Sequence, residues 1–146
     1  NYSATSTTVQ CIGPDGRDVA LKPAVGKSEQ QKTLRATLHE LIDEKGAIPS
    51  QIIILTPRSQ ENTLWNEGTL LGNYRLTWNL GASGNSNIRV CTIHSFKGLE
   101  SPIVILTELD YAFPDTRDQL IYIGASRARN HLIVIGTLPA AGRSEG

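Results

Sequence analysis

The sequence predicts an α/β fold in which a parallel sheet is covered by helices on both faces. Short runs of apolar, mostly β-branched residues occur at residues 52–55, 103–106 and 132–135. Runs of this kind are typical of strands buried on both sides, because neither side is left for water. Helical segments alternate with these runs, at residues 28–46, 60–71 and 118–128. This β–α–β alternation indicates a parallel sheet.

The first predicted elements surround a turn. The sequence GPDG at residues 13–16 separates two short apolar runs, 9–12 and 19–21. These runs either pair as a small hairpin or only lead into the domain. Ser28 then begins a capping-box pattern, and leucines recur at helical spacing until Gly46, so we expect a helix over this span.

Further elements follow in the middle of the chain. A helix is predicted over residues 60–71, and its Trp65 is expected to lie in the core. The sequence GASGNSN at residues 81–87 predicts an exposed loop, because it is rich in turn-forming residues. The mixed run at residues 88–93 predicts another strand.

Two aromatic residues leave two interpretations open. Tyr74 and Trp78 flank Arg75 in the sequence NYRLTW. Bases stack on aromatic rings with about 1–3 kcal/mol each, so these residues could form a basic and aromatic patch for nucleic acid. Alternatively, this segment is a strand whose rings pack inward.

Length and composition predict one domain. The chain has 146 residues, which suit a domain over residues 19–138 with a lead-in at 1–18 and a loose tail at 139–146. Fourteen basic residues balance fourteen acidic ones, so affinity for nucleic acid would need locally placed Lys and Arg. The chain contains no methionine, and we expect a segment of a longer protein.

Targeting signals and cysteine usage predict a cytoplasmic protein. No apolar run reaches the roughly 18 residues of a membrane span, and the start lacks signal-peptide features. Cys11 and Cys91 lie far apart in apolar, strand-like runs. A small buried hydrophobic role is expected for both, with the thiols reduced.

The chain lacks a P-loop. Gly26, Lys27 and Ser28 resemble the end of that motif, but Leu21 stands where its first glycine is required. No predicted strand ends in an acidic pair that could hold magnesium. We therefore expect that the isolated chain does not hydrolyse ATP and holds no metal.

Three segments resemble conserved motifs of superfamily 1 helicases of the UvrD and Rep type. Residues 89–106, RVCTIHSFKGLESPIVIL, resemble the fifth motif, and residues 120–136, LIYIGASRARNHLIVIG, resemble the sixth. Residues 52–62, IIILTPRSQEN, look like the fourth. The resemblance implies the second, C-terminal RecA-like motor domain of such a helicase.

This resemblance implies a function for the parent protein, an ATP-dependent DNA helicase or translocase. ATP with Mg²⁺ would bind between this domain and an N-terminal motor domain that carries the P-loop, and single-stranded DNA would cross both domains. Two alternatives remain open. The chain could be a non-catalytic binding or scaffold module that kept the fold, or part of an RNA-directed helicase of the same superfamily.

Two arginines are predicted to act in catalysis. Arginine presents a rigid, permanently charged fork of donors, which suits a phosphate whose charge shifts during transfer. Arg127 is the expected arginine finger, and Arg58 is expected to reach the same phosphate from another direction. The alternative for Arg127 is a surface or ion-pair role, and the alternative for Arg58 is a solvated loop arginine. The resemblance also implies a group of nucleotide-side residues, namely Lys97, Gly98, Glu100 and Arg129.

Polar residues at the end of the predicted strand 88–93 are implied on the nucleic-acid side. These are Thr92, His94 and Ser95. Short polar groups suit hydrogen bonds to phosphate oxygens, which position a strand without reading its sequence. His39 and His131 are expected to be structural. Lys97 could bind phosphate or pair with an acidic neighbour.

Overall fold

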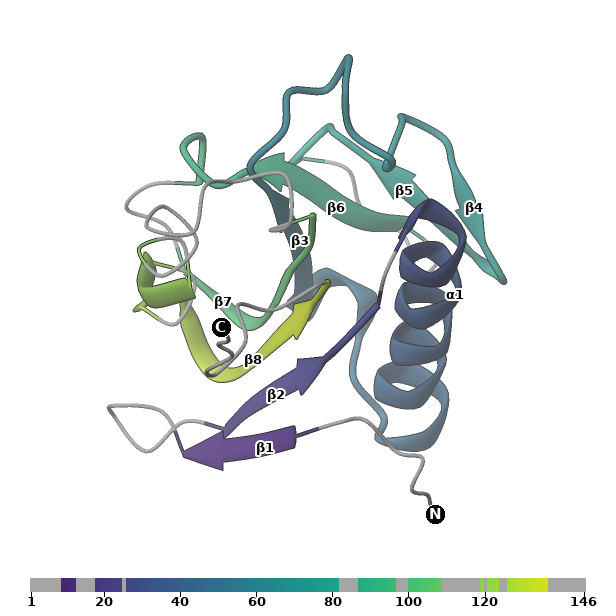
Figure 1. The fold of residues 1–146 in the computed structure, drawn as a ribbon. Helices are drawn as coiled ribbons and strands as arrows, with labels where there is room; N and C mark the ends of the chain where they lie inside the picture. Colours follow the sequence, from purple (N-terminus) through teal and green to yellow (C-terminus); the bar gives the residue numbers. More distant parts are fainter. Residues whose placement is uncertain are drawn as a thin grey trace.

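The computed structural model describes residues 9–12, 18–24, 26–81, 87–96, 100–108, 119, 121–123 and 126–136. The strands of this part of the chain form one eight-stranded sheet (Figure 1). They are β1 (Val9–Ile12), β2 (Asp18–Lys22), β3 (Ile52–Thr56), β4 (Leu70–Leu71), β5 (Tyr74–Thr77), β6 (Asn87–Thr92), β7 (Ser101–Leu106) and β8 (Ala128–Ile135). Their order across the sheet is β1-β2-β8-β7-β3-β6-β5-β4.

From β2 to β5 in this order, each strand is parallel to the next. Only the two outermost pairs, β1 with β2 and β4 with β5, are antiparallel. In register, Ile52 pairs with Ile103, and Ser101 pairs with Ala128. The starts of β3, β7 and β8 therefore share one edge of the sheet, which we call the amino edge. The ends of these strands and of β6 share the opposite, carboxyl edge.

One face of the sheet packs against helix α1 (Gly26–His39), which continues as a π-helical turn at Glu40–Glu44. Apolar side chains of the helix are buried against alternate residues of the central strands. They include Leu34, Leu38 and Leu41 on the helix, and Ile52, Ile54, Val90, Ile105 and Ile133 on the sheet. The helix begins two residues before the predicted cap at Ser28. A short 3-10 helix, Pro49–Gln51, leads into β3.

The other face of the sheet carries a second apolar cluster. It contains the alternate residues of the same strands, including Ile53, Leu55, Leu106 and Val134, with Phe96. Ile121 and Ile123, from the helical residues 121–123, pack against this cluster. Because the strands are buried from both sides, the predicted α/β fold is confirmed.

The helix predicted over residues 60–71 is wrong. Turns and the short strand β4 occupy this span. Side chains of this segment form local hydrogen bonds with the backbone and with each other, and bonds of this kind to the backbone compete with helix formation. The backbone N–H of Trp65 donates to Thr63 Oγ1 at 3.1 Å, and Asn62 Nδ2 donates to Ser59 Oγ at 2.9 Å. Gly68, at φ +82°, reverses the chain before β4.

Several other expectations concern the ends of elements and the aromatic residues. β1 and β2 pair as a hairpin, the first of the two alternatives. Its turn, and residues 82–86 of the loop predicted at 81–87, lie outside the described residues. β8 begins at Ala128, four residues before the predicted run. Trp65 is fully buried, as expected. Tyr74 is 8% exposed and Trp78 is partly buried against the same apolar cluster, so these two rings pack inward, as the second interpretation expected.

No helix among the described residues combines the length and the apolar character that a membrane crossing requires.

We expect substitution of Gly46 by alanine to lower stability through backbone strain alone. Gly46 ends the helical segment at φ +78°, and an added Cβ would meet nothing within 4 Å. For a residue with a Cβ this conformation costs about 1–2 kcal/mol, which thermal denaturation would report as a lower Tm. Gly81→Ala is the control, because a Cβ there makes only an ordinary 3.5 Å contact with Asn79 and its φ is not in the left-handed region. Equal Tm values for the two variants would contradict this assignment.

Candidate functional site

Three predicted nucleotide-side residues lie together at the amino edge. Glu100 directly precedes β7, and Arg127 directly precedes β8. Because Ser101 pairs with Ala128, the two positions are neighbours across the sheet. Arg129 Nε lies 3.8 Å from Glu100 Oε1, and both side chains are more than 60% exposed. We call Glu100, Arg127 and Arg129 the amino-edge group.

Arg127 is half-buried at the point where the last helical residues pass into β8. The Ser126 hydroxyl donates to the carbonyl of Ile123 at 2.7 Å, which orders the chain just before the arginine. The Nε of Arg127 is buried and has no hydrogen-bond partner within the part of the chain that the structure describes. A buried donor without a partner costs about 1–3 kcal/mol. Arg127 thus has one unsatisfied donor among the described residues, while the rest of its half-buried side chain keeps some surface exposed.

The predicted nucleic-acid residues lie at the carboxyl edge. Thr92 ends β6, and its hydroxyl donates to Ser95 Oγ at 2.8 Å and accepts from the Ser95 N–H at 3.0 Å. The ring of Phe96 is buried beneath this turn, while His94 and Ser95 are exposed. We call Thr92, His94 and Ser95 the carboxyl-edge group. Its small polar groups and its imidazole ring face solvent on an ordered turn.

The structure separates Arg58 from Arg127. Arg58 follows Thr56, the last residue of β3, and so lies at the carboxyl edge. Arg127 lies at the amino edge, and β7 runs between the two edges with six residues, whose five rises of about 3.3 Å span about 16.5 Å. The expectation that both arginines reach one phosphate therefore loses its geometric basis. Arg58 lies with the carboxyl-edge group instead.

Sequence analysis missed the residue that holds Arg58. Glu108, two residues beyond β7, is completely buried, and its Oε2 lies 3.6 Å from Arg58 Nη1. The hydroxyls of Thr56 and Thr63 both donate to Glu108 Oε1, the former at 2.8 Å. The N–H of Leu64 donates to Oε2 at 3.1 Å. Three neutral donors and one cation thus compensate the buried charge.

The backbone of Glu108 is also unusual, with φ +60°, the one positive value among the described residues other than glycine. This conformation costs about 1–2 kcal/mol for a residue with a side chain. Strain of this size persists where surrounding contacts impose it. The sequence signal for Glu108 is weak, because a single acidic residue after an apolar run does not match the acidic pair typical of a magnesium site.

Two further predicted residues, Lys97 and Gly98, lie outside the described residues.

Cys91, beside Thr92 on β6, is buried, and its thiol donates to the carbonyl of Thr92 at 3.2 Å. Burial raises the pKa of the Cys91 thiol, and the Arg89 guanidinium offsets this only in part. A protonated, buried thiol is a poor nucleophile, in keeping with the predicted packing role.

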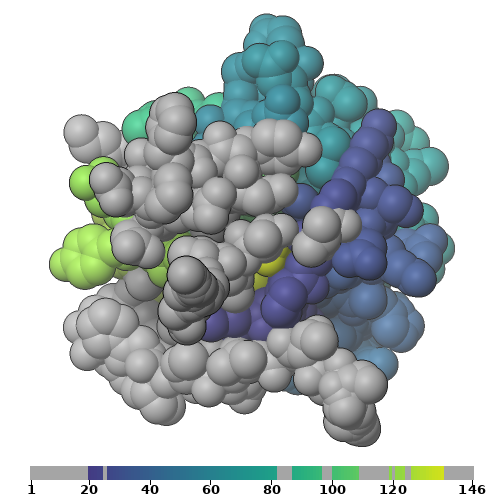
Figure 2. All heavy atoms as spheres, in the orientation of Figure 1, coloured from purple at the N-terminus to yellow at the C-terminus, as the bar shows by residue number. Residues whose placement is uncertain are grey.

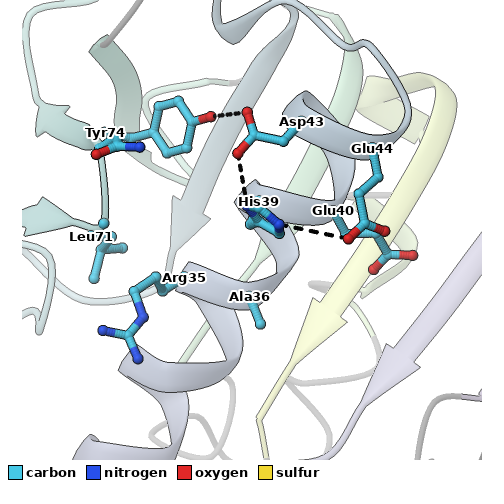
Figure 3. A pocket seen from close by; sticks show the side chains of 10 residues that line it. Arg35, Ala36, His39, Glu40, Asp43, Glu44, Leu71 and Tyr74 are labelled. Carbon is cyan, nitrogen blue, oxygen red and sulfur yellow. Dashed lines mark hydrogen bonds and ion pairs between the residues drawn. The ribbon is translucent and has the colours of Figure 1, made fainter.

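Three cavities lined by described residues lie away from the carboxyl-edge group. One of about 520 Å³ lies between α1 with its π-helical turn and the β4–β5 hairpin (Figure 3). In it, Asp43 accepts from the Tyr74 hydroxyl at 2.8 Å and pairs with His39 at 2.7 Å. Desolvation and the Asp43 carboxylate raise the pKa of Tyr74. These contacts agree with a structural role for His39.

A smaller cavity of about 310 Å³ lies along the amino edge and is lined in part by Lys45, Gln51 and Asn130. Among the described residues, no three His, Cys, Asp or Glu side chains are arranged to hold a metal ion.

Comparisons with known proteins agree with this fold. The model of a family described as the UvrD-like helicase C-terminal domain matches residues 87–135, which span β6 to β8. A solved structure, the C-terminal domain of a possible DNA helicase from Lactobacillus plantarum, is similar with a TM-score of 0.54 and 20% identity. The similarity covers 82% of this chain and 71% of that chain. No curated protein matches the chain.

At this level of identity the structural likeness establishes the fold alone. The family match covers both segments in which the fifth and sixth motifs were recognised. Over residues 87–135 the chain is thus similar to the UvrD-like helicase C-terminal domain.

We expect substitution of Thr63 by valine to destabilise the protein, because it removes a hydroxyl that donates to the buried Glu108 carboxylate. Hydrogen bonds to charged groups contribute about 1.5–3 kcal/mol, so the free energy of unfolding should fall by about that amount in urea denaturation. Thr69→Val, at a partly exposed threonine that follows in the same segment, should change it by less than about 0.5 kcal/mol. An unaltered urea midpoint for Thr63→Val would argue against this network.

Proposed function

We propose that the chain is the second motor domain of an ATP-dependent DNA helicase or translocase. In this proposal, ATP binds at the amino edge, between this domain and an N-terminal motor domain of the same parent protein. Single-stranded DNA binds at the carboxyl edge. The division of the motif residues between two opposite edges carries the proposal, because a motor domain must bind ATP and nucleic acid on separate surfaces of one rigid body.

The amino-edge group supplies the contacts to the nucleotide. Arg127 acts as an arginine finger, because its guanidinium is partly desolvated and its Nε lacks a partner among the described residues. The exposed part of the half-buried guanidinium would contact a γ-phosphate oxygen. Such an arginine is typically worth about 10³–10⁵ in turnover. Because the phosphate is held by the other domain, the same contact makes closure of the two domains depend on ATP.

Glu100 and Arg129 flank this contact. Exposed ion pairs contribute only about 0–1 kcal/mol, so the Glu100–Arg129 pair can open at little cost. The Glu100 carboxylate is then able to accept hydrogen bonds from ribose hydroxyls, and Arg129 to approach a phosphate. Lys97 and Gly98 are proposed on the same side.

Mg²⁺ and the P-loop are assigned to the N-terminal motor domain. The partly exposed Arg127 side chain fits a phosphate held there, and Mg²⁺ would neutralise negative charge on the phosphates. Within this chain, the amino-edge group would orient the nucleotide and stabilise developing negative charge. A cytoplasmic location follows from this function, since ATP and DNA are both available there.

The carboxyl-edge group supplies the contacts to single-stranded DNA. Thr92 and Ser95 present short hydroxyls on an ordered turn, and His94 is exposed beside them. Such groups position a phosphate backbone without reading bases. Arg58 is assigned to this group in place of the nucleotide site, because it follows the neighbouring strand at the same edge.

We expect Arg127→Ala, in the parent protein, to leave ATP binding largely in place and to lower turnover by about 10³-fold or more. The reason is that the arginine stabilises charge that develops during phosphoryl transfer. Steady-state ATP hydrolysis and binding of a fluorescent ATP analogue would measure the two effects. The matched control is Arg35→Ala, which removes an exposed arginine of α1. Unaltered turnover in Arg127→Ala would remove the assignment of the finger, and also favour a non-catalytic binding module.

We expect His94→Ala to weaken affinity for single-stranded DNA, and its stimulation of ATP hydrolysis, by several-fold while basal turnover stays close to wild type. Titration of ATP hydrolysis with oligothymidine and with oligouridine would measure both effects and separate a DNA-directed from an RNA-directed motor. His39→Ala, at an exposed histidine on α1, is the control. If His94→Ala reduced basal turnover alone, the two edges would be assigned the wrong way round.

A further inference from the structure

We propose that Glu108 is a positioning residue that holds Arg58 in place to contact a phosphate of single-stranded DNA. This inference rests on the proposed function, since it deepens the nucleic-acid contact at the carboxyl edge. Glu108 itself touches no ligand in this proposal. It acts only through the orientation of the Arg58 side chain.

The Glu108 carboxylate is a fixed anchor. Its side chain has no exposed surface, and each of its oxygens accepts a hydrogen bond from a neutral donor. Thr56 and Thr63 hold Oε1, and the N–H of Leu64 holds Oε2. The donors come from the end of β3 and from the segment that follows it, whereas Glu108 follows β7. The anchor therefore fastens two neighbouring strand ends to each other.

Arg58 is ordered from both ends by the same network. Its backbone N–H donates to Thr56 Oγ1 at 3.1 Å, and the same hydroxyl donates to Glu108. At the other end, Arg58 Nη1 lies 3.6 Å from Glu108 Oε2, with 27% of the side chain exposed. This distance is longer than a hydrogen bond, so the contact is an ion pair that leaves part of the Arg58 side chain exposed.

The ordered arginine lies next to the carboxyl-edge group. The N–H of Ile93, which begins the turn with His94, donates to the carbonyl of Thr56 at 3.0 Å. The turn after β6 and the segment after β3, which contains Arg58, thus leave neighbouring, hydrogen-bonded strand ends. This segment, residues 57–69, projects at the top of the surface in Figure 2. A phosphate backbone held by Thr92 and His94 would pass close to Arg58.

A simpler role for the ion pair predicts the opposite result. If Arg58 only compensates the buried charge, then Glu108 is merely a negative charge near DNA. Its removal would leave affinity for DNA unaltered or raise it. If Glu108 positions Arg58, its removal lowers affinity even though a negative charge has been deleted. The sign of the change therefore separates the two roles.

The test measures the affinity of the 146-residue chain for labelled oligothymidine by fluorescence anisotropy over a range of salt concentrations. Arg58→Ala should weaken binding and reduce the slope of log K against log salt by about 0.7, the value for one phosphate contact on a single strand. Glu108→Gln should do the same. The double variant should bind no more weakly than Arg58→Ala, because Glu108 acts only through the arginine.

Glu108→Asp provides a second variant, because it keeps the charge and shortens the side chain by one methylene. A loss of affinity in this variant cannot come from altered charge, and it carries the test if Glu108→Gln fails to fold by circular dichroism. Glu67→Gln is the matched control, at an exposed carboxylate that accepts from the Trp78 N–H at 2.7 Å in the same segment. This control should keep the wild-type salt slope.

The test distinguishes failure of the positioning role of Glu108 from failure of the proposed DNA surface. If Arg58→Ala weakens binding but the folded Glu108 variants bind like wild type or more tightly, the positioning role of Glu108 is overturned. If Arg58→Ala and His94→Ala both bind like wild type, the proposed DNA surface itself is wrong. A salt slope that stays at the wild-type value in Glu108→Gln, with lower thermal stability, would identify Glu108 as structural only.

Discussion

Burial of the central strands on both faces is the constraint on which the rest of this structure depends. β3, β6, β7 and β8 carry apolar side chains on both faces of the sheet, so both faces must be covered. These strands pair in parallel. Parallel strands start at one edge and end at the other. A polar residue that precedes one of these parallel strands therefore lies at the amino edge, and one that follows such a strand lies at the carboxyl edge. The rigid sheet between the two edges can transmit a displacement from one to the other.

The two edges differ in how completely their polar groups are satisfied within the chain. At the carboxyl edge, Thr92, Ser95 and Thr56 take part in ordered hydrogen bonds that shape a surface. At the amino edge, Arg127 keeps a buried donor without a partner among the described residues, and the Glu100–Arg129 pair is exposed and long. A preformed surface suits a ligand that slides along it. An incomplete set of partners suits a ligand that a second domain must bring.

The Glu108 network shows how tertiary contacts maintain a locally unfavourable arrangement. A buried carboxylate and a left-handed backbone are each costly alone. They persist because donors from β3 and the following segment converge on the carboxylate. Those donors also explain why residues 60–71 do not form a helix, since Thr63 and Leu64 are engaged by a residue that lies more than forty positions away in the sequence.

The sequence by itself determined the features that depend on local pattern. The apolar runs specified the central strands, and the order of polar residues in TIHSFKGLE and SRAR identified the two motif segments, because spacing along one strand or turn is a local property. Only the tertiary structure decided which edge each residue reaches. It placed Arg58 with Thr92 and away from Arg127, and it paired Arg58 with Glu108. The physical reason is that strand order and register arise from packing between distant segments, which no local pattern contains.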